Sequence, residues 1–263
     1  MIANQKPRTY EQQPEEIQTM FNDIAPTYDT LNHLLSFGLD IRWRKKAIQS
    51  LEEKQGGTFL DIAAGSGDFS FETLTLQPKL VVATDFAQNM LNVFQQKLDS
   101  RSYIVPIELV SCDALALPFH DQTFDATMVA FGIRNFANRL KGLREMYRVL
   151  KPNGISLILE LSKPRTPIIS QLYTIYTRAG LPLLGKIISR HNSAYRYLPE
   201  SISKFPERTE FLAMMKEAGF SETKAIPLTF GVATIYVGRK PTVIARSGAI
   251  SATTKQSDLP DNH

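Results

Sequence analysis

The chain of 263 residues has a single cysteine, Cys112, and this scarcity removes two classes of architecture. One thiol cannot form an internal disulfide framework, and it cannot supply a cysteine-rich zinc cluster. No apolar run reaches the roughly 20 residues that a membrane-spanning helix needs, and the first sixteen residues contain no hydrophobic signal core. We therefore expect a cytoplasmic protein in a reducing compartment, without a metal site.

The excess of positive charge is also small, because the chain has 30 lysines and arginines against 26 aspartates and glutamates, a formal charge of only +4. A surplus this small gives no reason to expect a nucleic-acid partner, but it suits transient peripheral contact with an anionic inner-membrane surface. The 43% of apolar residues are enough for one sizeable core with a small accessory lid. Whether the chain forms a homodimer is left open.

The middle of the chain alternates between short apolar runs and helical patterns. Strands that alternate with helices are joined by right-handed crossovers in a parallel sheet with helices on both faces. The pattern therefore predicts a doubly wound, Rossmann-like α/β fold. The expected strands are 58–63, 80–84, 107–111, 126–130 and 155–161, and the expected helices are 39–53, 68–76, 88–98 and 138–149.

Two more expected strands, 224–228 and 234–238, lie too close together for a crossover helix, and Gly231 falls between them. They predict an antiparallel hairpin. The complete sheet is then mostly parallel and seven-stranded, with an antiparallel last strand.

The folded part of the chain is expected to be one domain over residues 14–240. Residues 1–13 are polar and predict a flexible N-terminus, and a helix beginning near Pro14 opens an N-terminal helical cap over 14–56. The alternation lapses over 163–206, a stretch rich in aliphatic residues and tyrosines that is too long for an ordinary connection and predicts a lid insertion. Residues 241–263 predict a disordered tail.

The end of the first expected strand carries the most informative motif, in which Asp61 is followed by Ala63, Gly65 and Gly67. Small residues let the backbone approach a ligand closely, and the helix that follows presents free N–H groups. A dinucleotide fold would place a third glycine where Ser70 stands, to receive a pyrophosphate. A carboxylate beside the pocket suits a cofactor that carries an ammonium and a sulfonium.

Acidic residues also end the next two expected strands. Asp85 is placed to accept hydrogen bonds from a ribose diol, although it could also cap the helix that follows. Asp113 is placed to accept from an adenine amino group, and Phe86 and Ala114 complete the predicted cofactor set. Three acidic strand ends and a reversed last strand are typical of class I S-adenosylmethionine-dependent methyltransferases.

Three segments then resemble the ubiquinone/menaquinone biosynthesis C-methyltransferase family. They are Tyr28–Ser36 continuing to Trp43, Phe131–Phe136, and Arg148–Gly154 continuing to Glu160 and Ser162. The last pattern recurs widely in class I methyltransferases, whereas the first two are more restrictive. The likeness runs from about Thr19 to Gly238. The chain departs from the family at Leu31, Asp40 and Asn153, where methionine, histidine and glycine are usual, and at Asp40 a carboxylate replaces a titratable imidazole.

The resemblance implies methyl transfer from S-adenosylmethionine to a ring carbon of reduced demethylmenaquinone, a membrane-borne prenylated quinol. Arg134 and Asn135 are assigned to the quinol oxygen, and Tyr28 to closure over the cofactor. A ubiquinone precursor or a soluble small molecule remains an alternative acceptor. A nicotinamide dehydrogenase would need the glycine that Ser70 replaces, and a noncatalytic module would not keep the acidic strand ends.

Overall fold

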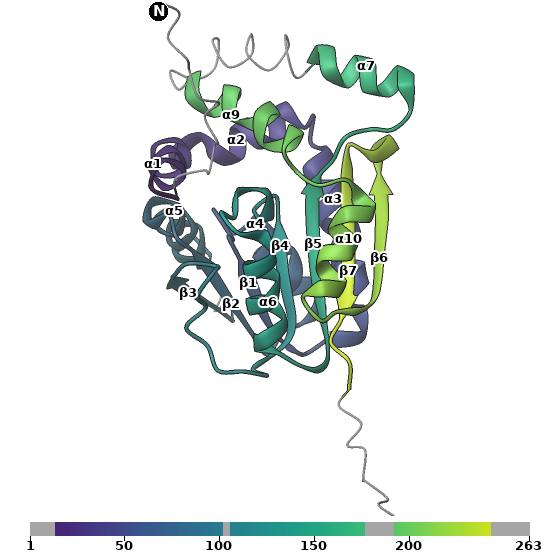
Figure 1. Cartoon of the computed structure of the whole chain (residues 1–263). Coiled ribbons are helices and arrows are strands. Elements are labelled where there is room, and N and C mark those ends of the chain that lie inside the picture. The colour runs from purple at the N-terminus through teal and green to yellow at the C-terminus, as the bar shows by residue number, and fades with distance from the viewer. Residues whose placement is uncertain (1–13, 102–105, 177–191, 243–263) are drawn as a thin grey trace, which may run out of the picture.

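A computed structural model of the chain describes residues 14–101, 106–176 and 192–242 (Figure 1). The predicted flexible N-terminus (1–13) lies outside the described residues, and so does the predicted disordered tail beyond residue 242. Within the predicted lid, residues 177–191 also lie outside them.

The strands form one sheet in the order β3-β2-β1-β4-β5-β7-β6. Adjacent strands from β3 to β5 are parallel, and β7 runs antiparallel to both β5 and β6. The predicted seven-stranded, mostly parallel sheet with a reversed last strand is therefore confirmed. The strands are β1 (Thr58–Ile62), β2 (Leu80–Asp85), β3 (Ile107–Ser111), β4 (Phe124–Ala130), β5 (Leu150–Leu161), β6 (Ser221–Leu228) and β7 (Ala233–Arg239).

Two hydrophobic clusters lie on opposite faces of the sheet, because successive strand residues point to opposite sides. Leu60 and Ile62 of β1 pack with α6 (Arg139–Val149) and α10 (Arg208–Glu217), which lie in front of the sheet in Figure 1. Phe59 packs on the other face with α3 (Leu39–Ile48), the 3₁₀ turn η2 (Gln49–Lys54) and α4 (Asp68–Thr73).

Predicted and observed helices differ mainly at their ends. The expected helix 39–53 divides into α3 and η2, and the expected helix 68–76 ends as α4 followed by the 3₁₀ turn η3 (Leu74–Leu76). Helix α5 (Gln88–Asp99) begins at the predicted residue. At α6 the predicted first residue, Asn138, is the N-cap, and its side chain accepts a hydrogen bond from the Lys141 N–H.

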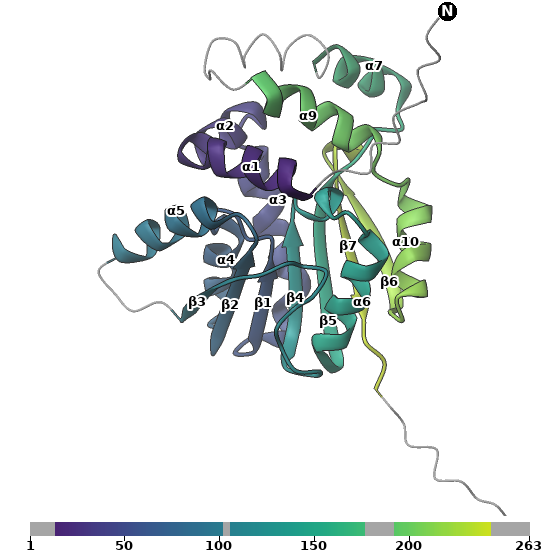
Figure 2. The same cartoon turned by 60° about the vertical axis from the view of Figure 1, so that its left-hand side comes forward.

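Further helices lie across the carboxyl ends of the parallel strands, at the top of Figures 1 and 2. They are α1 (Pro14–Ile24), α2 (Tyr28–Leu35), α7 (Pro167–Ile175) and α9 (Asn192–Ser203), with the short turns η1 (Ala25–Thr27), η4 (Ile133–Asn135) and η6 (Thr229–Gly231). Polar contacts hold the first two helices on α5. The Asn89 N–H donates to Asn22 Oδ1 at 2.9 Å, and Lys97 Nζ lies 2.5 Å from Asp29 Oδ2.

Strand order reverses between β1 and β4, so the loops that leave these strands diverge and open a crevice at this edge. The cap helices cover that crevice (Figure 2). No described helix combines the length and the apolar composition that crossing a bilayer requires.

Candidate active site

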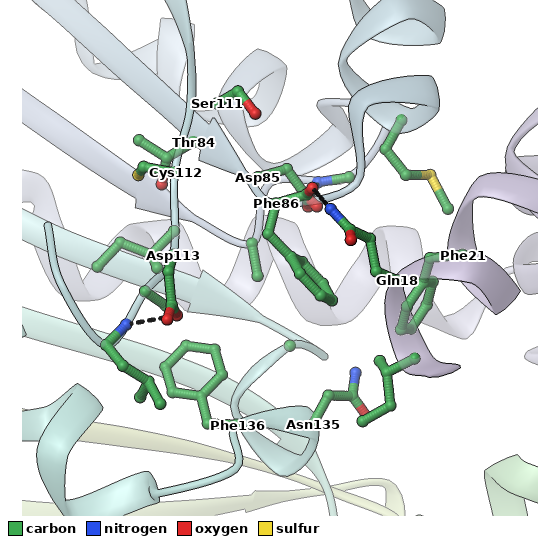
Figure 3. A pocket seen from close by; sticks show the side chains of 18 of the residues that line it. Gln18, Phe21, Thr84, Asp85, Phe86, Ser111, Cys112, Asp113, Asn135 and Phe136 are labelled. Carbon is green, nitrogen blue, oxygen red and sulfur yellow. Dashed lines mark hydrogen bonds between the residues drawn. The ribbon is translucent and has the colours of Figure 1, made fainter. Parts of the chain in front are cut away.

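A cavity of about 380 Å³ lies in the crevice, between the carboxyl ends of β1 to β4 and helix α1 (Figure 3). It is the place where the motif residues were expected to meet. The predicted cofactor residues that line it are Ala63, Gly65, Asp85, Phe86, Asp113 and Ala114. Asp61 and Gly67 are not among its lining residues.

The loop after β1 brings bare backbone to this cavity. Gly65 and Gly67 have φ angles of +57° and +92°, in the left-handed region that glycine adopts without strain. At Gly67 a Cβ atom would lie 2.3 Å from the ring of Phe94, so the position is restricted by packing as well. Asp29 of α2 accepts a hydrogen bond from the Ser66 hydroxyl and ties the cap to this loop.

Asp85 is buried at the end of β2 and holds two loops together. Its Oδ2 accepts from the Gly65 N–H at 2.9 Å, and its Oδ1 accepts from the Ala87 N–H at 2.8 Å. Burial raises the pKa of this carboxyl, against the effect of these backbone donors. A carboxylate has about four acceptor positions, so Asp85 still has capacity for ligand hydroxyls on the cavity side.

The end of β3 supplies the opposite wall. Asp113 is exposed and its Oδ1 accepts from the Leu115 N–H at 2.8 Å, which orients the carboxylate at the cavity (Figure 3). Beside it, burial raises the pKa of the Cys112 thiol to about 11. Because the thiolate is the nucleophilic form of cysteine, Cys112 is a wall residue and not a reactive group.

Asp61 lies behind the cavity loop and is completely buried. Its Oδ2 accepts from the Ser70 hydroxyl at 2.6 Å, while its Oδ1 has no hydrogen-bond partner among the described residues. Burial raises the pKa of this carboxyl to about 7. Ser70, which in the sequence was only the missing third glycine, is therefore the donor to Asp61.

Helix α1 contributes residues that sequence reasoning missed. Gln18 Nε2 donates to the Phe86 carbonyl at 2.5 Å, and the side chains of Gln18 and Phe21 face the ring of Phe86 across the cavity in Figure 3. These partners are 68 positions apart in the chain. No local pattern marks such a contact, because it depends on how the cap folds back over α5.

A second cavity, of about 350 Å³, adjoins the first on the side of the cap and the predicted lid. Its walls are largely aliphatic and aromatic, with a polar end formed by a few side chains of α2, α3 and η4. The aliphatic and aromatic residues are Leu35, Phe37, Leu39, Trp43, Phe131, Leu161, Ile169, Tyr173, Tyr176, Leu198, Ile202 and Val232, and the polar end comprises Tyr28, Asn32, Ser36, Asp40, Arg44 and Arg134.

Tyr28 and Phe131 line both cavities and so form the boundary between them. The ring of Tyr28 lies against Gly65, where an added Cβ would be 3.7 Å from its Cε1. Burial raises the pKa of the Tyr28 hydroxyl, opposed by the Arg134 charge and a hydrogen bond with Asn32. Closure of Tyr28 over the cofactor stays a prediction.

Phe131 has a φ of +57°, a left-handed backbone that a residue with a bulky side chain seldom adopts. Its N–H donates to the Leu159 carbonyl at 2.7 Å. The ring lies 6.2 Å from the ring of Trp43, and the Arg44 guanidinium stands 5.3 Å from its centroid. These contacts hold an aromatic side chain at the boundary of the two cavities despite the backbone strain.

Arg134 and Asn135, both predicted to act on the acceptor, lie on the two sides of this boundary. Arg134 lines the second cavity and Asn135 the first. Arg134 is buried, its Nη1 lies 2.8 Å from Glu160 Oε1, and its Nε has no partner among the described residues. Asn135 Oδ1 accepts from the Tyr197 hydroxyl of α9 at 2.8 Å.

Asp40, where histidine is usual in the family that the sequence resembles, is buried at the polar end of the second cavity. It accepts from Ser36 and Arg44, and its Oδ2 lies 2.8 Å from His33 Nδ1. Burial opposes ionisation of Asp40, but the Ser36 hydrogen bond and the Arg44 charge hold its pKa below the usual value. His33 and Asp68 complete this charge network, whose carboxylates Arg44 and Lys97 neutralise.

Comparison with known proteins agrees with this geometry. The ubiE/COQ5 methyltransferase family matches residues 8–240. A ubiquinone/menaquinone biosynthesis C-methyltransferase UbiE from Geobacter sulfurreducens is 44% identical over 86% of this chain and 89% of its own length. A demethylmenaquinone methyltransferase from Thermus thermophilus is 46% identical over 84% of this chain and 100% of its own.

Among solved structures, a SAM-dependent methyltransferase from Aquifex aeolicus superposes with a TM-score of 0.57 at 19% identity, covering 86% of this chain and 98% of its own. This likeness shows the class I methyltransferase fold. Together with the sequence relatives, the family match identifies the chain as a member of the ubiE/COQ5 methyltransferase family.

Proposed function

We propose that this methyltransferase transfers a methyl group from S-adenosylmethionine to a ring carbon of reduced demethylmenaquinone. One observation carries the proposal: an acidic cavity and an apolar cavity meet at Tyr28 and Phe131. A cationic methyl donor suits the first, and a flat, prenylated acceptor suits the second. The names of relatives such as the Thermus thermophilus enzyme support this acceptor.

The first cavity fits S-adenosylmethionine by its chemistry. Asp85 and Asp113 line it, and no lysine, arginine or histidine is among its described lining residues. Such a wall disfavours a pyrophosphate and favours a ligand with positive groups. Asp85 would accept from the ribose hydroxyls, Asp113 from the adenine amino group, and Asp61 would face the ammonium end through the loop of Gly65.

The second cavity would hold the quinol ring at its polar end and the start of the prenyl tail along its apolar walls. Tyr173 of α7 and Leu198 and Ile202 of α9 belong to the predicted lid 163–206 and line this cavity. Burying tail methylenes contributes up to about 0.8 kcal/mol each. Because a prenyl tail partitions into lipid, the proposal includes contact of the protein with a membrane surface.

When bound, S-adenosylmethionine supplies an electrophilic methyl group. The ring carbon of the quinol becomes a good nucleophile as the adjacent hydroxyl ionises, so the protein must stabilise negative charge on that oxygen. We assign this role to Arg134, whose Nε–H has no partner among the described residues while its Nη1 is held by Glu160. Tyr28 and Phe131 orient the acceptor ring, and the cap and lid helices exclude water.

The decisive experiment offers the purified enzyme reduced demethylmenaquinone and the demethylated ubiquinone precursor side by side, with oxidised quinones as controls. We expect methylation of the reduced demethylmenaquinone, because an oxidised ring is electron-poor. Equal turnover of the oxidised quinone under non-reducing conditions would contradict the mechanism. Preference for the ubiquinone precursor would replace the proposed acceptor and leave the chemistry intact.

The role of the lid is tested with water-soluble quinols that carry zero, one or two isoprene units. We expect kcat/KM to rise with each unit and Tyr173→Ser to flatten that rise while cofactor affinity is unchanged. If the tailless quinol performs as well as its prenylated homologues, the insertion has a structural role only.

A further inference from the structure

Three large apolar side chains are exposed at the end of the molecule that carries the second cavity. Phe37 is 75% exposed, Phe230 is 73% exposed and Ile168 is 70% exposed. They lie on separate elements: the turn between α2 and α3, the η6 turn between β6 and β7, and the first turn of α7. Figures 1 and 2 both show these elements at the carboxyl edge of the sheet.

The backbone at both phenylalanines is strained. Phe37 has a φ of +53°, and Phe230 has a φ of +56° between Thr229 at +43° and Gly231 at +91°. A bulky residue in the left-handed region persists only where surrounding contacts impose it. Neither side chain is buried in the core, so both rings are exposed to solvent despite the backbone strain.

Backbone hydrogen bonds close each of the two turns, and one side-chain hydrogen bond ties η6 to α3. Trp43 Nε1 of α3 donates to Thr229 Oγ1 at 2.8 Å, and the Val232 N–H donates to the Thr229 carbonyl at 3.1 Å. In the other turn the Gly38 N–H donates to the His33 carbonyl at 2.7 Å. Each phenylalanine therefore lies on a turn that is closed by hydrogen bonds.

Each exposed residue lines the second cavity or is close in sequence to a residue that does. Phe37 itself lines that cavity, Ile168 precedes the lining residue Ile169, and Phe230 lies two positions before the lining residue Val232. An apolar surface around the mouth of an apolar cavity lets a lipid-soluble substrate pass between hydrocarbon and protein without crossing water.

Exposed cations accompany these apolar residues. Arg42 follows the exposed Ile41 in α3, and Lys163 and Arg165 precede Ile168. Arg165 has an acidic neighbour, Glu207 at 3.3 Å, in an exposed pair. Basic side chains near protruding aromatic and aliphatic groups match the anionic headgroups and acyl chains of a lipid surface.

We infer that Phe37, Ile168 and Phe230 form a membrane anchor that seats the mouth of the acceptor cavity on an anionic bilayer. The inference rests on the proposed function, since a prenylated quinol is what makes a bilayer the occupant of this surface. Three exposed apolar side chains on three separate elements suit insertion between lipids better than docking on the flat face of a second copy of the chain. Moving each of these three side chains from water to the acyl boundary should strengthen binding of the protein to vesicles by about tenfold or more.

The test measures binding of the full chain to sedimentable vesicles of phosphatidylcholine and phosphatidylglycerol in equal parts. The double variant Ile168→Ser/Phe230→Ser should bind at least about tenfold more weakly. Its turnover of the tailless quinol in buffer should equal that of the unmodified protein, because neither residue lines a cavity. The matched control is Gln122→Ser, an exposed position with a φ of +56° that precedes β4 at the opposite edge of the sheet.

Unchanged vesicle binding by the double variant would overturn the anchor. A fall in molecular mass of the double variant to half that of the unmodified protein, measured by sedimentation, would also overturn it and make this face a contact between two copies. The proposed function fails separately, if the unmodified protein methylates none of the reduced quinols, tailless or prenylated, an outcome that vesicle binding does not affect.

Discussion

The Arg134 guanidinium and the Glu160 carboxylate form a buried ion pair, with Nη1 and Oε1 2.8 Å apart at the polar end of the second cavity. Glu160 Oε2 also accepts from the Arg134 backbone N–H at 3.1 Å. Burial disfavours the Arg134 charge, but the charge and hydrogen bond of Glu160, together with Tyr28 and Tyr197, raise the Arg134 pKa. Glu160 thus favours the charged form of Arg134, the proposed catalytic arginine, and orients its guanidinium.

Removing either partner alone should be strongly destabilising, because the other would be left buried and unpaired. Glu160→Gln or Arg134→Ala is expected to lower the free energy of unfolding by about 3–5 kcal/mol. The double variant Arg134→Leu/Glu160→Leu should recover most of that loss. Urea denaturation of the three proteins measures the effect.

Activity separates the structural from the catalytic role of Arg134. The stabilised double variant should still bind S-adenosylmethionine with unchanged affinity and show a large loss of kcat on the quinol. Recovery of kcat together with stability would mean that Arg134 only supports the fold.

Replacing Asp85 should weaken cofactor binding, since the ribose hydroxyls would lose a charged acceptor. Asp85→Asn is expected to lower affinity for S-adenosylmethionine by about 1–3 kcal/mol, or roughly five- to 150-fold. Calorimetry on the folded variant measures this, and Asp113→Asn, at an exposed position, should have a smaller effect. A dissociation constant unchanged by Asp85→Asn would remove Asp85 from the cofactor site.

Asp61 should make stability depend on pH near neutrality. Burial raises its pKa from 3.8 to about 7, so between these values the folded protein binds a proton that the unfolded chain has released. The stability that this bound proton confers is fully present below the unfolded pKa of 3.8, and it is lost as the pH rises through about 7. Asp61→Asn should flatten this dependence, which is at most about 4 kcal/mol. Denaturation at several pH values, with Ser70→Ala as a second variant, measures it.

Binding of a cation beside Asp61 should reverse that protonation. We expect S-adenosylmethionine to release a proton when it binds near neutral pH, visible as a binding enthalpy that changes with the ionisation enthalpy of the buffer. In Asp61→Asn this buffer dependence should vanish. Its persistence in the variant would assign the proton to another group.

Alanine substitutions at Gly67 and Gly38 separate the cost of close packing from the cost of backbone strain. Both have positive φ, of +92° and +70°, but a Cβ at Gly67 would meet the Phe94 ring at 2.3 Å, whereas a Cβ at Gly38 meets nothing within 4 Å. Gly38→Ala should cost about 1 kcal/mol of backbone strain. Gly67→Ala should cost about 1–3 kcal/mol more. Thermal unfolding compares them, and equal losses would refute the packing argument.

The sheet and the acidic strand ends were predictable because their signals are local. Each expected strand is an apolar run that ends in a loop, and Asp85 and Asp113 follow such runs directly. Parallel strands bring their carboxyl ends to one edge, so the pattern along the chain is enough to place these residues together. The reversed last strand followed from the short spacing around Gly231.

The second cavity was predictable only in outline. The resemblance pointed to Tyr28 and Arg134, but the boundary role of Phe131, the Glu160 partner and the Gln18 contact depend on tertiary packing between distant segments. Asp40 shows the same limit: its exchange for histidine was visible in the sequence, while its pairing with Arg44 and His33 was not.

The walls of the second cavity come almost entirely from segments outside the sheet. Leu161 is its only described lining residue that belongs to a strand, while the rest come from α2, α3, α7, α9 and the turns between elements. Substitutions in these segments can therefore reshape the acceptor cavity while most residues that line the first cavity stay unchanged. Engineering a new acceptor should therefore begin in the cap and lid.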